Sequence, residues 1–124
     1  MAGWRYNLSL AIVALVLGAS TDAGAVTLQG FGRCLKSRGA TFYGASWCPH
    51  CRAQRETLGE AMEHVRYVEC AVDGERGEST PACRAAKIDG YPTWTFADGS
   101  RASGELSLER LAAKTGCELP KSLP

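Results

Sequence analysis

The chain has 124 residues, with 14 basic and 13 acidic side chains and a formal net charge of +1. This length suits one folded domain, and the absence of a basic stripe or an acidic tail excludes nucleic acid as the expected partner. The first residues differ from the rest of the sequence. Arg5 precedes an apolar run at Leu8–Leu17, and Ala23-Gly24-Ala25 follows it. This layout predicts a secretory signal peptide at 1–25 and a mature domain at 26–124.

The compartment is indicated by the apolar run and by the cysteines. The run has about ten residues, short of the ~20 that a membrane-spanning helix needs, so a cleaved signal is favoured over an uncleaved membrane anchor. All six cysteines follow residue 25, and an even cysteine set behind a signal peptide indicates disulfide bonds. We therefore expect a periplasmic, extracytoplasmic or otherwise secreted protein, membrane-anchored only if the N-terminal segment is retained.

Hydrophobic periodicity and turn residues predict the element order α-β-α-β-α-β-β-α. Helices are expected at 28–37, from Pro49 to about His64, from an N-cap at Thr80 to about Lys87, and from Ser107 to a stop at Gly116. Strands are expected at 41–43, 65–70, 93–97 and 101–104, with a loop at 71–79. Strands separated by helices imply a parallel pair, whereas Asp98-Gly99 predicts an antiparallel hairpin. The order predicts an α/β fold with a mixed central sheet and helices on both faces.

The chemistry is indicated by Cys48-Pro49-His50-Cys51, at the start of the second predicted helix. Unpaired N–H groups and the helix dipole favour a thiolate at Cys48, and Cys51 lies one turn further on, where it can form a disulfide with Cys48. Cys48 is thus the predicted nucleophile and Cys51 the resolving thiol. His50 is expected to stabilise the thiolate and make the disulfide more oxidising. The Cys48–Cys51 disulfide is the redox group, and no other cofactor is expected.

Four segments together resemble the thioredoxin-like domain found with vitamin K epoxide reductase homologues, within the thioredoxin superfamily. They are Phe42–Cys51, Tyr67–Cys70, Gly90–Trp94 and Gly99–Gly104, and the resemblance extends from about Phe31 to Pro120. Cys-Pro-His-Cys is also similar to the oxidant DsbA, and Gly-Tyr-Pro-Thr to protein disulfide isomerase. The resemblance implies a thioredoxin fold and a monomer that exchanges disulfides with secreted protein thiols. It also implies a membrane quinone-linked partner, resembling vitamin K epoxide reductase, which this chain would meet in trans.

The loop Gly90-Tyr91-Pro92-Thr93 is the second element of the predicted site. A proline just before a strand is a candidate for a cis peptide bond, and in a thioredoxin fold this loop faces the cysteine pair. The Tyr91 backbone can then pair with an extended substrate segment, and Trp47 would shield one side of the cysteines. Trp47, Tyr91 and Pro92 are accordingly the predicted substrate-binding residues.

One position departs from the resemblance. Phe42 stands where thioredoxin and DsbA carry a buried carboxylate, so no acid is available there to take the proton of Cys51. Glu69, on the neighbouring predicted strand, is the candidate substitute proton acceptor. The alternative is that Glu69 is a strand-end residue in solvent.

The four remaining cysteines are predicted to be structural. Cys70 and Cys83 flank a glycine-containing loop and are expected to form a bridge that pins it, the alternative being a second redox pair. Cys34 and Cys117 lie near the two ends of the domain, and the sequence leaves their pairing open. A zinc site made by Cys48, Cys51, Cys70 and Cys83 is a further alternative, disfavoured because the second pair is not closely spaced.

The predicted function is that of an enzyme, a protein thiol–disulfide oxidoreductase of the oxidase or isomerase type rather than a reductase. The first alternative is a non-catalytic binding module or metallochaperone with a thioredoxin fold. The second is a zinc-binding structural domain. Because both active-site cysteines are present, the sequence favours the enzyme.

Overall fold

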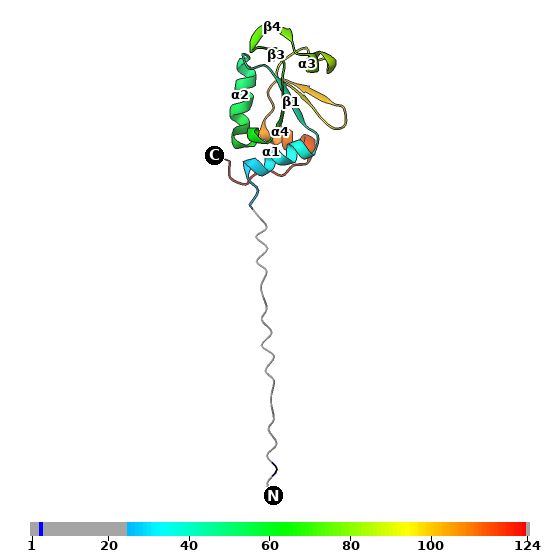
Figure 1. Cartoon of the computed structure of the whole chain (residues 1–124). Helices are drawn as coiled ribbons and strands as arrows, with labels where there is room; N and C mark the ends of the chain where they lie inside the picture. Colours follow the sequence, from blue (N-terminus) through cyan, green and yellow to red (C-terminus); the bar gives the residue numbers. More distant parts are fainter. Residues whose placement is uncertain (1–2, 4–24, 124) are drawn as a thin grey trace.

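The computed structural model describes Gly3 and residues 25–123 of the chain (Figure 1). Apart from Gly3 and Ala25, the predicted signal peptide lies outside the described residues. A search of the described helices finds none that is both long and apolar enough to span a bilayer.

The central sheet has four strands, in the order β2-β1-β5-β6 (Figure 1). These strands are β1 (Thr41–Gly44), β2 (Arg66–Glu69), β5 (Thr93–Thr95) and β6 (Arg101–Ser103). The pair β1–β2 is parallel, and the pairs β1–β5 and β5–β6 are antiparallel. The predicted mixed sheet is confirmed. The crossover through α2 gives the parallel pair β1–β2, and the turn at Asp98-Gly99 gives the antiparallel pair β5–β6.

The described part of the chain also contains four α-helices and one short 3-10 helix. They are α1 (Leu28–Ser37), α2 (Pro49–Leu58), the 3-10 helix η1 (Gly59–Glu63), α3 (Pro81–Ala85) and α4 (Leu108–Thr115). Side-chain oxygens of Thr27 and Ser107 accept hydrogen bonds at the starts of α1 and α4. Gly116 ends α4 in the left-handed conformation, as the sequence predicts.

Side chains alternate between the two faces of the sheet, and both faces are covered. Phe42 and Trp94 point into the main core, which also contains buried side chains of α1, α2 and α4. Tyr43 and Val68 point to the opposite face and pack against Cys83 of α3. Helices therefore cover both faces, and the α/β thioredoxin fold predicted from the sequence is confirmed.

Two predicted helix boundaries are wrong. The second helix was expected to reach His64, but α2 ends at Leu58 because Gly59 has a φ of +52°, which a continuing helix does not tolerate. The chain continues as the 3-10 helix η1. The third helix was expected to reach Lys87 but ends at Ala85.

The segment predicted as a loop at 71–79 is instead a β-hairpin. It consists of β3 (Ala71–Val72) and β4 (Glu75–Ser79), joined by Asp73 and Gly74, whose φ angles are +52° and +74°. Positive φ at both turn residues is the geometry that an Asp-Gly pair favours in a two-residue hairpin. The hairpin lies at the same end of the molecule as the start of α2 (Figure 1).

A buried amide connects the start of the last helix to the core. Gln54 of α2 is fully buried; its Nε2 donates to the Leu106 carbonyl at 2.9 Å. Its Oε1 accepts from the Leu106 N–H at 2.7 Å and from the Trp94 indole at 3.1 Å. All the polar atoms of the Gln54 side chain therefore have partners, which fixes α2 relative to β5 and to the segment before α4.

Replacing Gly32 by alanine is expected to lower the free energy of unfolding by about 1–3 kcal/mol, because a Cβ there would lie 2.2 Å from the Ala61 carbonyl oxygen. Helix propensity alone would predict a gain of about 1 kcal/mol. Gly30→Ala in the same helix is the control; its Cβ would meet two side chains and no backbone, the Thr27 hydroxyl at 3.2 Å and the Arg33 guanidinium at 3.9 Å, and should not destabilise the protein. Urea denaturation measures both, and equal effects would contradict the packing argument.

Candidate active site

Cys48 and Cys51 lie at the start of α2, as predicted. Cys48 is the N-cap residue and Pro49 the first helical residue, where a missing N–H costs nothing. All six cysteines are in the described part, and these two are the free thiols. Cys48 is 6% exposed and Cys51 is fully buried, so Cys48 is the more accessible sulfur of the pair.

The surroundings of Cys51 favour its protonated form. Burial raises the pKa of the Cys51 thiol to about 12; the Ala45 N–H, 3.4 Å from the sulfur, opposes the rise, and the Cys48 thiol adds to it. The positive charge of Arg55 also opposes the rise. In the reduced protein Cys51 therefore keeps its proton, and charging it during a reaction requires stabilisation from nearby groups.

The structure brings the loop at Tyr91 alongside Cys48. The Cys48 thiol lies 3.8 Å from the Tyr91 carbonyl oxygen, and the Tyr91–Pro92 peptide bond is cis, as predicted. The Trp47 and Tyr91 rings meet edge to face with 6.0 Å between centroids. Trp47 and Tyr91 thus lie together next to Cys48, whereas the Pro92 side chain is fully buried, and the role of the three residues in binding substrate stays a prediction.

His50 interacts with Glu105 rather than with the cysteines. Its ring is 73% exposed, and Nδ1 lies 2.9 Å from the Glu105 carboxylate, in the segment before α4. Among the hydrogen bonds of the described residues, none joins His50 to Cys48. Its predicted influence on the Cys48 thiolate would therefore act through space rather than through a direct donor contact.

Glu69 is half-buried, and among the hydrogen bonds of the described residues none joins it to Cys51. Its carboxylate accepts hydrogen bonds from the Ser46 N–H, at 2.8 Å, and from the Tyr67 hydroxyl. Burial pushes the pKa of Glu69 up, but these hydrogen bonds and the Arg55 charge outweigh it, so the pKa is lowered. Burial raises the pKa of Tyr67, and its hydrogen bond to Glu69 adds to that rise. The proton thus stays on Tyr67 and the carboxylate is ionised.

The hairpin β3–β4 extends the surface next to Cys48. The Arg76 guanidinium lies 4.5 Å from the centre of the Trp47 ring, and the Ser79 and Tyr91 hydroxyls are 2.9 Å apart. Sequence reasoning assigned this segment no role at the site. The Asp73-Gly74 pair was the one sequence feature that could have indicated such a role. It marks a hairpin turn, and a hairpin here would bring Arg76 back towards the end of β2.

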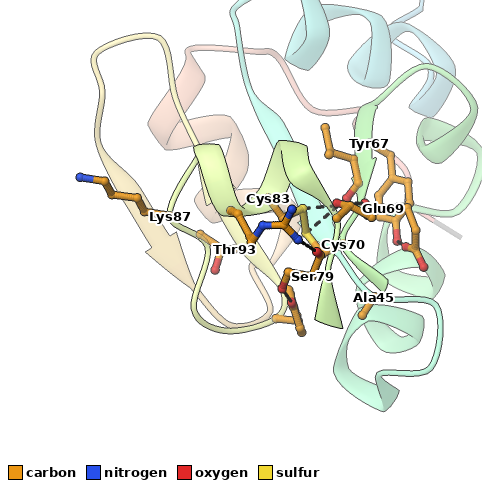
Figure 2. Close-up of a disulfide and its surroundings, with 12 residues drawn as sticks. Ala45, Tyr67, Glu69, Cys70, Ser79, Cys83, Lys87 and Thr93 are labelled. Atoms are coloured by element: carbon orange, nitrogen blue, oxygen red, sulfur yellow. Dashed lines mark hydrogen bonds between the residues drawn. A yellow bond between two sulfur atoms is a disulfide. The ribbon is translucent and has the colours of Figure 1, made fainter. Parts of the chain in front are cut away.

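The predicted Cys70–Cys83 disulfide is confirmed, and Cys34 pairs with Cys117, a pairing that the sequence left open. Cys70–Cys83 joins the end of β2 to α3 across the hairpin, and Cys34–Cys117 joins α1 to the residue after the α4 stop (Figure 2 shows the first). Thr80, the predicted N-cap of α3, donates its hydroxyl to the Glu69 carbonyl instead of capping. Because Cys70 and Cys83 are bonded to each other, the four-thiol zinc set is not assembled. The described residues contain no cluster of three or more metal-ligating side chains.

We expect dithiothreitol to reduce the Cys48–Cys51 disulfide of the oxidised protein well before Cys70–Cys83. Cys70 and Cys83 are both fully buried, and a bridge closing a loop of this size typically contributes ~3 kcal/mol. Mild reduction followed by alkylation and peptide mass spectrometry gives the order of labelling. Labelling of Cys70 and Cys83 as early as Cys48 would contradict a structural role for that bridge.

The fold and the site define a thioredoxin-like domain with a vicinal cysteine pair at a helix start. No family model matches the chain. The chain is homologous to the thiol-disulfide oxidoreductase LTO1 of Arabidopsis thaliana, with 45% identity over 91 residues, which cover 71% of this chain. The chain spans 24% of that relative's length.

Two solved structures are also similar to this chain. Thioredoxin of Fasciola hepatica is 20% identical, with a TM-score of 0.42 over 76% of this chain and 97% of that one. Oxidised mitochondrial thioredoxin 3 of Saccharomyces cerevisiae is 24% identical, with a TM-score of 0.35 over 63% of this chain and 74% of that one.

Proposed function

We propose that this protein is an extracytoplasmic thiol–disulfide oxidoreductase that exchanges disulfides with protein thiols through Cys48 and Cys51. The observation that carries the proposal is the placement of Cys48, the more exposed of the two free thiols, at the start of α2, with fully buried Cys51 one turn further on. Helix N-termini favour thiolates, and a paired second thiol allows release of a bound substrate. The similarity to LTO1, itself described as a thiol-disulfide oxidoreductase, supports the same chemistry.

In the oxidising direction, a substrate thiolate attacks Cys48 of the Cys48–Cys51 disulfide. The bond to Cys51 breaks, Cys51 leaves as a thiolate and takes up a proton, and a mixed disulfide forms between Cys48 and the substrate. A second substrate thiolate then attacks the substrate sulfur of that bond and releases Cys48. Two electrons pass from the two substrate thiols to the cysteine pair, and reduction of a substrate disulfide is the same sequence reversed.

Substrate would dock against Trp47 and Tyr91, while buried Pro92 would hold the Tyr91 backbone in place beside Cys48. The Tyr91 carbonyl beside the Cys48 sulfur leaves the adjoining backbone available to an extended peptide, which would add to it as a strand. This is the geometry required to hold a flexible substrate while its sulfur is bonded to Cys48.

Catalysed oxidation of reduced ribonuclease and catalysed reduction of insulin test the proposal directly. The oxidase or isomerase type predicts the first activity and a reduction potential nearer −120 mV than −270 mV. His50, two residues after Cys48, would help to raise this reduction potential by stabilising the Cys48 thiolate. Absence of both activities would favour a binding module or metallochaperone instead.

The proposed partner is a quinone-linked membrane enzyme resembling vitamin K epoxide reductase, which would reoxidise Cys48–Cys51 in trans, and the proposed location is periplasmic or otherwise secreted. Two disulfides in addition to the reactive pair support an oxidising compartment. Cell fractionation with N-terminal sequencing tests the location and cleavage before residue 26. Size-exclusion chromatography tests the proposed monomer.

A further inference from the structure

Charge must appear on a buried sulfur during the proposed reaction. Cys51 attacks Cys48 as a thiolate in one direction and leaves as a thiolate in the other, yet its side chain is fully buried. The position where thioredoxin-like proteins carry a buried acid is Phe42, which lies in the apolar core. A buried thiolate without a compensating group is strongly disfavoured.

Arg55 is the cation placed to compensate. It follows Cys51 by four residues on α2, which puts the two on the same face of the helix. Its guanidinium carbon lies 4.2 Å from the centre of the Tyr67 ring. The Arg55 side chain is half-buried and, in the described chain, takes part in neither of the two ion pairs, although its charge also lowers the pKa of Glu69.

The Tyr67 ring connects this cation to the sulfur of Cys51. A Cβ built on Gly44 would lie 3.0 Å from Cε2 of Tyr67 and 3.2 Å from Sγ of Cys51. The ring edge and the sulfur are therefore both neighbours of Gly44. The Arg55 guanidinium lies over the face of that ring and is half-buried, so its charge acts on Cys51 across a partly buried region, where electrostatic interactions are stronger than in bulk water.

We infer that Arg55 is a positioning residue for the proposed exchange reaction, whose positive charge stabilises the Cys51 thiolate as it attacks or leaves Cys48. The inference rests on the proposed function and names a residue for one of its steps. Since the same thiolate occurs in oxidation and reduction, Arg55 serves both directions.

The other charged and titratable groups around Cys51 are Cys48, Tyr67 and Glu69. The Tyr67 proton is held by Glu69, and both oxygens of that carboxylate accept hydrogen bonds, from the Ser46 N–H and the Tyr67 hydroxyl. A negative charge at Glu69 opposes a thiolate at Cys51, whereas Arg55 lowers the pKa of Cys51. Glu69 as proton acceptor and Arg55 as stabilising cation therefore predict different effects of substitution.

Ellman's reagent, added in equimolar amount to the reduced protein, separates the two thiols. Cys48 attacks first, releasing one thionitrobenzoate and forming a mixed disulfide with the other. Cys51 then attacks Cys48, releasing the second thionitrobenzoate and closing the Cys48–Cys51 disulfide, while the two thiol protons go to solvent. Stopped-flow absorbance resolves both phases, and the rate of the second phase is measured from pH 6 to 9.

Arg55→Met keeps the aliphatic contact with the ring but removes the charge. It should slow the second phase about threefold to tenfold at pH 7, shift its pH profile to higher pH, and leave the first phase unchanged. Arg55→Lys should restore most of the rate. Arg52→Met, at an exposed position directly after Cys51, is the matched control and should behave as wild type in both phases.

Glu69→Gln distinguishes the alternative. If Arg55 is the acting group, the second phase of Glu69→Gln is unchanged or faster; if Glu69 accepts the proton, it is slower. An Arg55→Met second phase equal to that of Arg52→Met across the pH range would overturn the inference. Wild-type protein that releases only one thionitrobenzoate would instead overturn the proposed function, and with it this step.

Discussion

Replacing Cys48 by serine is expected to abolish thiol–disulfide exchange, reducing ribonuclease oxidation to the rate without protein. Cys48 is the more exposed of the two free thiols and lies at the N-terminus of α2, beside the Tyr91 carbonyl. A serine hydroxyl does not attack disulfides at neutral pH. Cys51→Ser should instead permit the first attack and block release, so that mixed disulfides between Cys48 and substrate accumulate.

The comparison of these variants is read on non-reducing gels and by mass spectrometry of the trapped adducts. Thr57→Ala, an exposed change on the same helix, controls for effects of mutating α2 and should exchange normally. Normal exchange by Cys48→Ser, or adducts attached to Cys51 in the wild type, would show that the nucleophile is wrongly assigned.

The largest loss of stability is expected for Gln54→Leu. The substitution leaves the Leu106 N–H, the Leu106 carbonyl and the Trp94 indole N–H without their partner in a buried region. Each unsatisfied buried group costs about 1–3 kcal/mol, partly offset by the apolar side chain of leucine, so we expect a loss of about 3–5 kcal/mol in the free energy of unfolding. This is a large part of the stability of a small domain.

Chemical denaturation followed by tryptophan fluorescence measures this loss. Thr57→Leu introduces the same side chain at an exposed position of α2 and should change stability by no more than about 0.5 kcal/mol. Trp94→Phe removes a single donor to Gln54 and should cost less than Gln54→Leu. If Gln54→Leu is no more destabilising than Thr57→Leu, the buried amide is not important for stability.

The sequence was sufficient to predict a mixed sheet, with a parallel pair and an antiparallel hairpin, and the position of the cysteine pair. Helix starts at Ser107 and at Pro49 are marked by local chemistry, a capping hydroxyl and a proline at the first helical position, which depends little on the rest of the fold. The Asp98-Gly99 turn is likewise a local preference. These features could therefore be read one segment at a time.

Features that depend on contacts between distant segments were missed or misread. Gln54 follows Cys51 by three residues and precedes Leu58 by four, so its position on the buried face of α2 could be predicted although it is polar. Its hydrogen-bond partners, Trp94 and Leu106, could not be predicted, because they lie far away in the sequence. Strand β4 carries no apolar side chain and therefore gives no alternating pattern. Its place beside Trp47 depends on the Arg76 contact, which no local rule predicts.

The Cys34–Cys117 bridge also has a mechanical consequence. It spans 83 positions in sequence and encloses the whole central sheet and the cysteine pair. A pulling force applied at residues 25 and 123 passes directly from Cys34 to Cys117 through the sulfur–sulfur bond. The sheet, which lies inside the loop closed by this bond, therefore carries no tension. Reducing that bond would release up to about 290 Å of extensible chain, at about 3.5 Å per residue. In a single-molecule pulling experiment the oxidised domain would therefore extend only through the segments outside the bridge, and its active site would stay folded under force.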